Sequence, residues 1–250
     1  MTATPWLSLL LGGVVSFHMP AAHAQLSGAL LNQLQNALNS GDTASLADLV
    51  ASSDEIGGSE LENRYSQLRR QFPDSQWSLA AGQDLADGRN TLTVSVVGNG
   101  SQAGRDFRLQ ASQTLAVRSD GLTLGSQEVL AEESIVRSGE RDLAVSVLAP
   151  ETVLTGQRYD LDVLMDEPLK DATLAGGLTE LTEADLLQEA SPEIELGALN
   201  AGGIFKTIQA PYEAGRQAWA ALLLHPEGTC LLYTSPSPRD MRRSRMPSSA

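Results

Sequence analysis

Three side chains in the first half of the chain have the chemistry to bind a small ligand together. Gln113 interrupts an alternating apolar run, so its amide is expected on the apolar side of a strand. Tyr65 and Trp77 each combine a large ring with one hydrogen-bond donor. If the apolar side of that strand lines a cavity, these three residues form the candidate ligand-binding set. The alternative is that Gln113 is a core amide satisfied inside the protein.

The carboxylates do not predict a catalytic pair or a metal site. Glu132 and Glu133 are adjacent, and adjacent residues of a strand point to opposite faces, so they are not expected to converge. Asp160 and Asp162 share a face, and carboxylate oxygens suit calcium. Apolar residues alternate with both aspartates, however, which indicates the solvated outer face of a strand. We expect no bound metal.

Histidine and cysteine chemistry is sparse. His18 and His23 lie near the N-terminus, His225 lies near the other end, and Cys230 is the single cysteine. No Cys–His set with zinc-binding spacing is present, and neither is a glycine-rich phosphate loop, so we expect no cofactor. Three aspartates in the first half are predicted to be turn or strand-end residues rather than catalysts: Asp84, Asp87 and Asp106.

The composition is acidic. The formal net charge is −14, and lysine occurs twice, at Lys170 and Lys206. Nucleic-acid binding and attachment to anionic membranes both need clustered basic residues, so this charge argues against both. The same charge is typical of a soluble, well-hydrated surface.

The elements that must position these residues begin with a helical period. Four leucines recur every four residues, at Leu26, Leu30, Leu34 and Leu38. Residues 39–42, Asn-Ser-Gly-Asp, are typical of a helix end followed by the cap of a second helix at 46–50. Another apolar stripe at 61–72 predicts a third helix, which Pro73 ends.

The period then changes to two. Apolar and polar residues alternate at 92–96 and at 107–117, which predicts long strands. Asn99-Gly100 predicts a hairpin turn between them, and Asp120-Gly121 predicts the next turn before a strand at 122–136. Three helices followed by antiparallel strands predict an α+β domain with its helices on one face of the sheet.

A second domain is expected after a linker at 138–141. Short apolar segments alternate there with Pro and Gly, and they lie at 143–148, 159–165, 173–181, 194–199, 204–210 and 218–224. Short strands with turn signals at this spacing predict an all-β sandwich.

The N-terminus has the features of a secretory signal. Residues 6–17 are apolar, and Ala22-His23-Ala24 is a small-x-small cleavage site. The apolar run is shorter than the ~20 residues of a spanning helix, which argues against a permanent anchor. We therefore predict a periplasmic or secreted bacterial protein whose mature chain begins at Gln25.

Residues 230–250 differ in origin from the rest in our interpretation. CLLYTSPSPRD, at 230–240, is what one frame of a transposase sequencing adapter encodes, and SRMPSSA, at 244–250, is what the flanking primer encodes in that frame. We expect a non-native tail that does not pack on the rest, after a sandwich truncated at 229. A local strand at 231–234 is compatible with the β character of that run. The predicted organisation is a signal peptide at 1–24, domains at 25–138 and 142–229, and this tail.

Two segments resemble known families. LQNALNSGDTASLADLV, at 34–50, resembles the first helix, turn and second helix of the nuclear transport factor 2-like (NTF2-like, SnoaL-like) superfamily. The resemblance implies an NTF2-like cone, with three helices closing over a curved antiparallel sheet, at 25–138. PETVLTGQRYDLDV, at 150–163, resembles bacterial immunoglobulin-like modules and implies an immunoglobulin-like sandwich. Enzymes of the NTF2-like superfamily use an Asp, or an Asp with His, inside the cone, and residues 25–138 contain no histidine.

These features favour an exported, non-catalytic binding or assembly module. The alternative hypothesis is a small-molecule enzyme, of isomerase or hydrolase type, that uses the cone as its pocket. The partners compatible with the sequence are a small apolar ligand, a protein, or a second copy that pairs through the sheet. Fold alone does not decide between these functions.

Overall fold

The structure is a computed structural model. It describes residues 26–50, 58–140, 143–150, 152–166, 173–182, 185, 192–199, 202–213, 217–235 and 237–239. The chain divides into two compact units, a first unit over Thr4–Val136 and a second unit over Arg137–Ala250. The predicted signal peptide at 1–24 lies outside the described residues.

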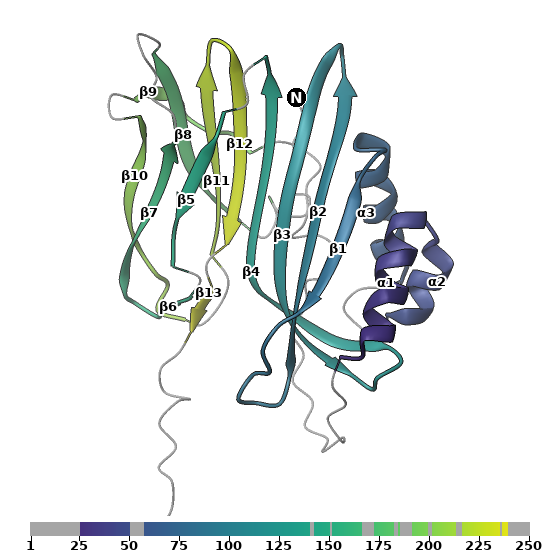
Figure 1. Cartoon of the computed structure of the whole chain (residues 1–250). Helices are drawn as coiled ribbons and strands as arrows, with labels where there is room; N and C mark the ends of the chain where they lie inside the picture. Colours follow the sequence, from purple (N-terminus) through teal and green to yellow (C-terminus); the bar gives the residue numbers. More distant parts are fainter. Residues whose placement is uncertain are drawn as a thin grey trace, which may run out of the picture. The chain divides into compact units, whose positions relative to one another are not determined.

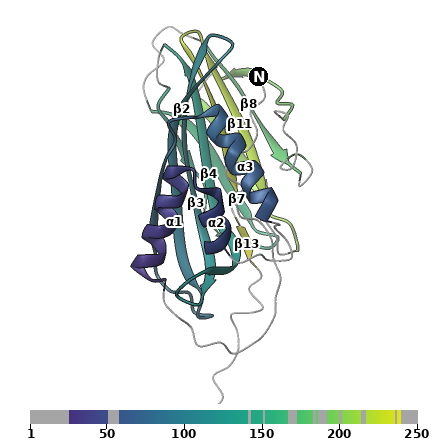
Figure 2. The same cartoon turned by 90° about the vertical axis from the view of Figure 1, so that its right-hand side faces the viewer.

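The first unit contains three helices and four strands among its described residues. They are α1 (Gly28–Ser40), α2 (Thr43–Leu49), α3 (Gly58–Gln71), β1 (Gln76–Ala81), β2 (Asn90–Gln102), β3 (Arg105–Ser119) and β4 (Leu124–Gly139), the last of which extends past the unit boundary. The strands are ordered β1-β2-β3-β4 in the sheet. Figure 1 shows the helices gathered beside β1, and Figure 2 shows them over one face of the strands.

The apolar stripe of each helix is its buried face. Ser27 caps α1 through its hydroxyl, which accepts a hydrogen bond from the Leu30 amide at 3.1 Å. Gly41 ends the helix with a φ of 80°, a left-handed conformation that glycine adopts easily. Asp42 caps α2 by accepting from the Ser45 amide at 3.0 Å. These helices bury residues of the predicted stripes against the sheet, namely Leu30, Leu34, Leu38, Leu46, Tyr65, Leu68 and Phe72.

The hairpin predicted at Asn99-Gly100 is wrong. Both residues lie inside β2, and the chain turns at Ala103 and Gly104, where φ is 52° and 74°. Gly100 is needed for another reason, because a Cβ there would overlap the backbone carbonyl oxygen of Gln71 at the end of α3. Glycine in a strand can therefore mark a close backbone approach, which a turn signal in the sequence does not distinguish.

The predicted fold class, an α+β NTF2-like cone with three helices on a curved sheet, is also wrong. The described chain is mostly β, with 56% strand and 18% helix. The helices occur where the apolar period predicts them. However, β2, β3 and β4 run for 13, 15 and 16 residues, and the second unit adds further strands. Local periodicity locates helices, but it does not establish the architecture around them.

The second unit is built from strands. They are β5 (Val145–Leu148), β6 (Thr152–Leu154), β7 (Arg158–Met165), β8 (Leu174–Leu181), β9 (Gly197–Leu199), β10 (Gly203–Gln209), β11 (Ala218–His225), β12 (Gly228–Ser235) and β13 (Ser237–Arg239). One antiparallel sheet has the order β10-β7-β5. Strands β12, β11, β8 and β9 are hydrogen-bonded neighbours in that order. A short parallel pair joins β13 to β6.

Strand β11 is buried on both sides. Trp219 packs with Tyr159, Leu161 and Ile208 of the β10-β7-β5 sheet. Ala220, on the opposite face of β11, belongs to a separate apolar cluster. A near-continuous apolar run, Ala-Trp-Ala-Ala-Leu-Leu-Leu, is what a strand covered on both faces requires.

The expectation that residues 230–250 do not pack on the chain is wrong for their first part. Residues 228–235 form β12, which pairs with β11 along its length. Leu232 is 1% exposed and Tyr233 is 2% exposed. The local strand expected at 231–234 is confirmed. A short run of apolar and aromatic residues after a tight turn can join a sheet through backbone hydrogen bonds, whatever its origin. Residues 240–250 lie outside the described residues.

None of the described helices is both long enough and apolar enough to cross a bilayer.

Candidate functional site

The three predicted site residues lie together in the interior of the first unit. Tyr65 on α3, Trp77 on β1 and Gln113 on β3 are 2%, 3% and 1% exposed. The ring centroids of Tyr65 and Trp77 are 6.1 Å apart. Trp77 is paired with Val96 and Gln113 with Val94, so they occupy neighbouring rows of the inner sheet face. The structure thus brings the predicted set into one apolar core.

Within this set, the Tyr65 hydroxyl is used for the fold. The Tyr65 hydroxyl donates a hydrogen bond to the carbonyl oxygen of Leu38 on α1. Burial raises the pKa of Tyr65 and outweighs the opposing effect of Arg69. The hydrogen bond from the neutral tyrosine to this carbonyl oxygen links α3 to α1. The indole Nε1 of Trp77 is buried without a hydrogen-bond acceptor among the described residues.

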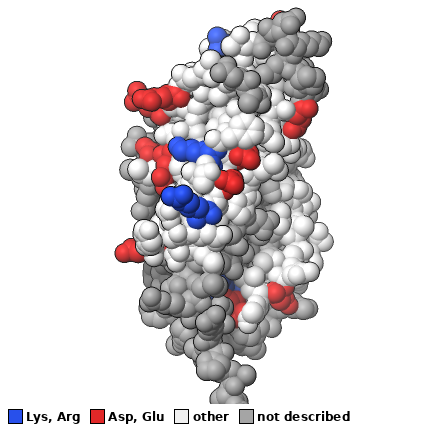
Figure 3. Space-filling model, turned by 90° about the vertical axis from the view of Figure 1, so that its left-hand side faces the viewer, with Lys and Arg blue, Asp and Glu red and all other residues white. Residues whose placement is uncertain are grey.

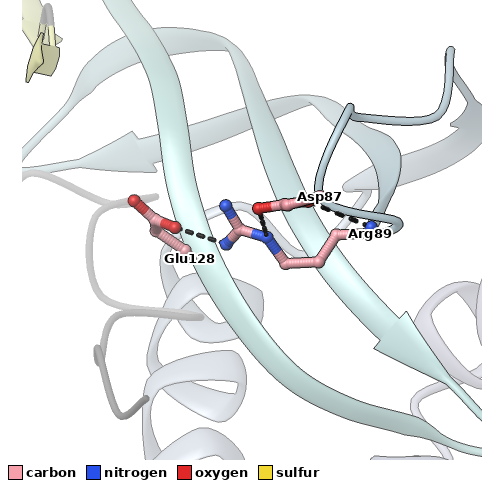
Figure 4. A network of polar contacts seen from close by, with 3 residues as sticks. All are labelled: Asp87, Arg89 and Glu128. Carbon is pink, nitrogen blue, oxygen red and sulfur yellow. Dashed lines mark hydrogen bonds and ion pairs between the residues drawn. The ribbon is translucent and has the colours of Figure 1, made fainter. Parts of the chain in front are cut away.

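Two of the three predicted turn aspartates, Asp84 and Asp87, contact neighbouring side chains, and the third, Asp106, lies near the start of β3. The Arg89 guanidinium donates from Nε to Asp87 at 2.8 Å and from Nη1 to Glu128 on β4, as Figure 4 shows. Burial lowers the pKa of Arg89, but the two carboxylates outweigh it and raise that pKa. Asp84 accepts from the Asn90 amide at 2.6 Å. These contacts fasten the connection between β1 and β2 to the sheet.

The other carboxylates lie as strand geometry predicts. Glu132 is buried on β4 and its neighbour Glu133 is exposed, as alternation requires. Asp160 is exposed on β7, and its carboxylate accepts from the Thr207 hydroxyl at 2.7 Å. In the part of the chain that the structure describes, no group of three or more His, Cys, Asp or Glu side chains could hold a metal ion.

The outer face of the first sheet is the surface that sequence reasoning missed. Register places nine side chains in three rows across β1, β2 and β3, and we call this surface the neutral face. Its rows are Gln76–Val97–Gln110, Ser78–Ser95–Ser112 and Ala80–Thr93–Thr114. None of these side chains ionises near pH 7. Alternation along each strand could have revealed the face, but the pairing between strands is not visible in the sequence.

The neutral face is open to solvent along β1. Gln76, Ser78 and Ala80 are exposed, and Val97 on β2 is 52% exposed. The two serines in the middle row of β2 and β3 are joined by a hydroxyl–hydroxyl hydrogen bond of 3.3 Å. Small side chains of this kind protrude little from the sheet, so the surface of another protein can approach the backbone closely.

The free edge of β1 is closed by side chains of α1. Asn39 accepts from the Trp77 amide at 2.7 Å and donates to the Trp77 carbonyl at 2.9 Å. Gln35 accepts from the Leu79 amide at 2.9 Å. An open strand edge can pair with another strand, and here three of its hydrogen-bonding groups are already occupied.

Charged side chains of both signs are present on the second unit. Figure 3, drawn from the side of Figure 1 on which β10 and β7 lie, shows Lys and Arg side chains beside Asp and Glu side chains. Mixed charges of this kind give no extended basic surface in that view.

Comparison with known families gives one match. Residues 140–235 match a family described as a domain of unknown function, DUF8623. The match covers most of the second unit and includes β12. No curated protein matches the chain.

Proposed function

We propose that the protein is an exported, non-catalytic assembly module in which two copies associate through the neutral face. The observation that carries the proposal is a sheet surface of nine uncharged side chains, five exposed and four half-buried, on a chain whose net charge is −14. Export rests on the predicted signal sequence.

Electrostatics favour this face over others for self-association. Two copies of an acidic chain repel one another at long range, and charged side chains placed opposite their own kind add to that repulsion. The neutral face adds no such repulsion, because none of its side chains is charged. Because the β1 edge is occupied by Asn39 and Gln35, a second copy is expected to stack on the face rather than extend the sheet.

A non-catalytic role is supported by how the chemically active groups are used. The Tyr65 hydroxyl and the Arg89 guanidinium both make contacts that hold elements of the first unit together. The predicted site residues lie within an apolar core that the helices cover. The interior is therefore explained by packing, and the neutral face is the feature that packing inside the unit does not explain.

Sedimentation velocity tests the proposal. The unaltered chain is expected to be a dimer, and Val97→Glu is expected to weaken dimerisation about tenfold or more, because each dimer then buries two like charges. Leu122→Glu is the matched control, since Leu122 is 76% exposed in the turn between β3 and β4 and lies off the neutral face. Added salt should strengthen the dimer by screening the net charge.

Two results would overturn the proposal. One is a monomeric unaltered chain at about 100 µM, where an interface of micromolar affinity would be filled. The other is a Val97→Glu variant that dimerises as well as Leu122→Glu. Val97→Thr, which keeps the branched shape and adds no charge, should dimerise like the unaltered chain, and circular dichroism shows whether each variant is folded.

A further inference from the structure

A second surface lies on the outer side of the β10-β7-β5 sheet. Register and alternation place seven side chains there, and we call this surface the β7–β10 face. Its members are Leu148 of β5, Arg158, Asp160 and Asp162 of β7, and Phe205, Thr207 and Gln209 of β10. The intervening residues point inward, where Leu161 and Val163 are fully buried.

One row of this face combines apolar groups with a carboxylate. Asp162 is paired with Phe205 on one side and with Leu148 on the other. Phe205 is 57% exposed and Leu148 is 55% exposed, so both extend into solvent around the carboxylate. Directly paired residues on neighbouring strands have Cβ atoms about 5 Å apart, so one partner side chain can reach both Phe205 and Asp162.

The two side-chain types of this row can each attract a cation, for independent reasons. A carboxylate forms an ion pair with Lys or Arg, and the face of an aromatic ring attracts the same cation through its quadrupole. The chain already contains a contact of the second kind, because the Lys206 ammonium lies 5.0 Å from the centre of the Trp219 ring. The next row adds a second carboxylate, Asp160, which is exposed.

We infer that the β7–β10 face binds a partner protein through a Lys or Arg side chain that sits between Asp162 and Phe205. An apolar residue of the partner, next to its Lys or Arg, covers Leu148. Charge complementarity favours a basic partner, because two aspartates outnumber Arg158 on this face and the ammonium of the neighbouring Lys206 lies over the Trp219 ring. The inference concerns the second unit and stands apart from the assembly proposed for the first unit.

The experiment uses the full chain and a defined probe. The probe is a fluorescent synthetic peptide of alternating Lys and Leu, measured by anisotropy at about 0.15 M salt, where longer-range attraction is largely screened. Phe205→Ala and Asp162→Asn are each expected to weaken binding about tenfold. Their matched controls are Leu122→Ala and Asp106→Asn, which remove an exposed apolar group and an exposed carboxylate elsewhere.

The result is decided by comparing each variant with its control. Phe205→Leu keeps the apolar surface and removes the ring, so binding weaker than that of the unaltered chain supports the cation–ring contact. Equal binding by Asp162→Asn and Asp106→Asn would overturn the inference, because it would show general attraction to an acidic protein. Equal binding by Phe205→Ala and Leu122→Ala would do the same. None of these variants touches the neutral face, so dimerisation should be unchanged in all of them.

Discussion

In the first unit, side chains of α1 bond to the backbone of β1, whereas in the second unit side chains bond to one another between two sheets. The Tyr159 hydroxyl on β7 accepts from Trp219 Nε1 of β11 at 3.1 Å and donates to Gln217 Oε1 at 2.8 Å. Gln217 Nε2 donates to Glu180 of β8 at 2.9 Å. A side-chain network of this kind fixes two sheets against each other, while the Asn39 contacts close one strand edge.

The two arrangements predict different losses of unfolding free energy when a side chain is removed. A network of buried side chains leaves its remaining members without partners when one is removed, and each such group costs free energy. When a side chain that covers a strand edge is removed, the backbone groups that it leaves unpaired can be reached in part by water. Mutations in the network are therefore expected to destabilise more than mutations at the edge.

The largest effect is expected for Tyr159→Phe. It removes the hydroxyl that joins Trp219 and Gln217, and both buried groups lose a partner. The expected loss is about 2–6 kcal/mol of unfolding free energy, from about 1–3 kcal/mol for each of the two groups left unpaired. Urea unfolding measures it.

The matched variant is Tyr65→Phe in the first unit. It breaks one hydrogen bond, to the carbonyl oxygen of Leu38, and should cost about 1 kcal/mol. A cost for Tyr159→Phe no greater than that for Tyr65→Phe would show that the inter-sheet network has no special role.

A smaller loss is expected for Asn39→Ala. The Trp77 amide and carbonyl lose their partner, and water replaces it in part, so the expected cost is about 1–2 kcal/mol. Hydrogen exchange should quicken at the Trp77 amide. Asn39→Asp keeps the oxygen that accepts from the Trp77 amide and loses the donor to the Trp77 carbonyl. The Trp77 amide should therefore stay protected from exchange in this variant. Unchanged exchange in Asn39→Ala would contradict the closed edge.

The smallest effect is expected at low pH, and it should begin in the first unit. Hydrogen bonds lower the pKa of Asp42, Asp74 and Asp120 there, chiefly from Ser45, Asn99 and Thr123 respectively. In the described part of the second unit, Asp185 is the carboxyl with a lowered pKa, through Thr182.

The sign of this effect follows from linkage. A lowered folded-state pKa contributes stability that is complete above the ordinary carboxyl pKa of 3.8 and is lost as pH falls through the folded value. Pepsin digestion between about pH 4 and pH 2 should therefore cut the first unit before the second. Asp74→Asn should reduce this acid sensitivity, and earlier cleavage in the second unit would contradict the comparison.

Some features of the site could be predicted from sequence because they depend on local spacing. The helical stripes identify Tyr65 as a buried residue, and alternation puts Gln113 on the apolar side of its strand. Alternation also places Asp160 on a solvated face, which the structure confirms. Each of these inferences uses residues within one element, where backbone geometry alone sets the direction of a side chain.

The side of β10 that faces the core could not be predicted, because both sides of this strand carry a similar mixture of residues. In β10, one side of the strand carries Ile204, Lys206 and Ile208, and the other carries Phe205 and Thr207. Both sets mix apolar and polar groups, so the sequence does not show which faces the core. The contact between Lys206 and the Trp219 ring decides it, and Phe205 is left in solvent.

The sequence by itself determined where the helices and most strands form, because helix and strand periods are properties of short segments. The tertiary structure decided that the chain is mostly β, that Gly100 accommodates α3 instead of a turn, and that residues 230–235 complete a strand pair. It also decided which side chains share the neutral face. Each of these outcomes depends on the register between segments far apart in the chain, and register is set by packing and backbone pairing across the sheet.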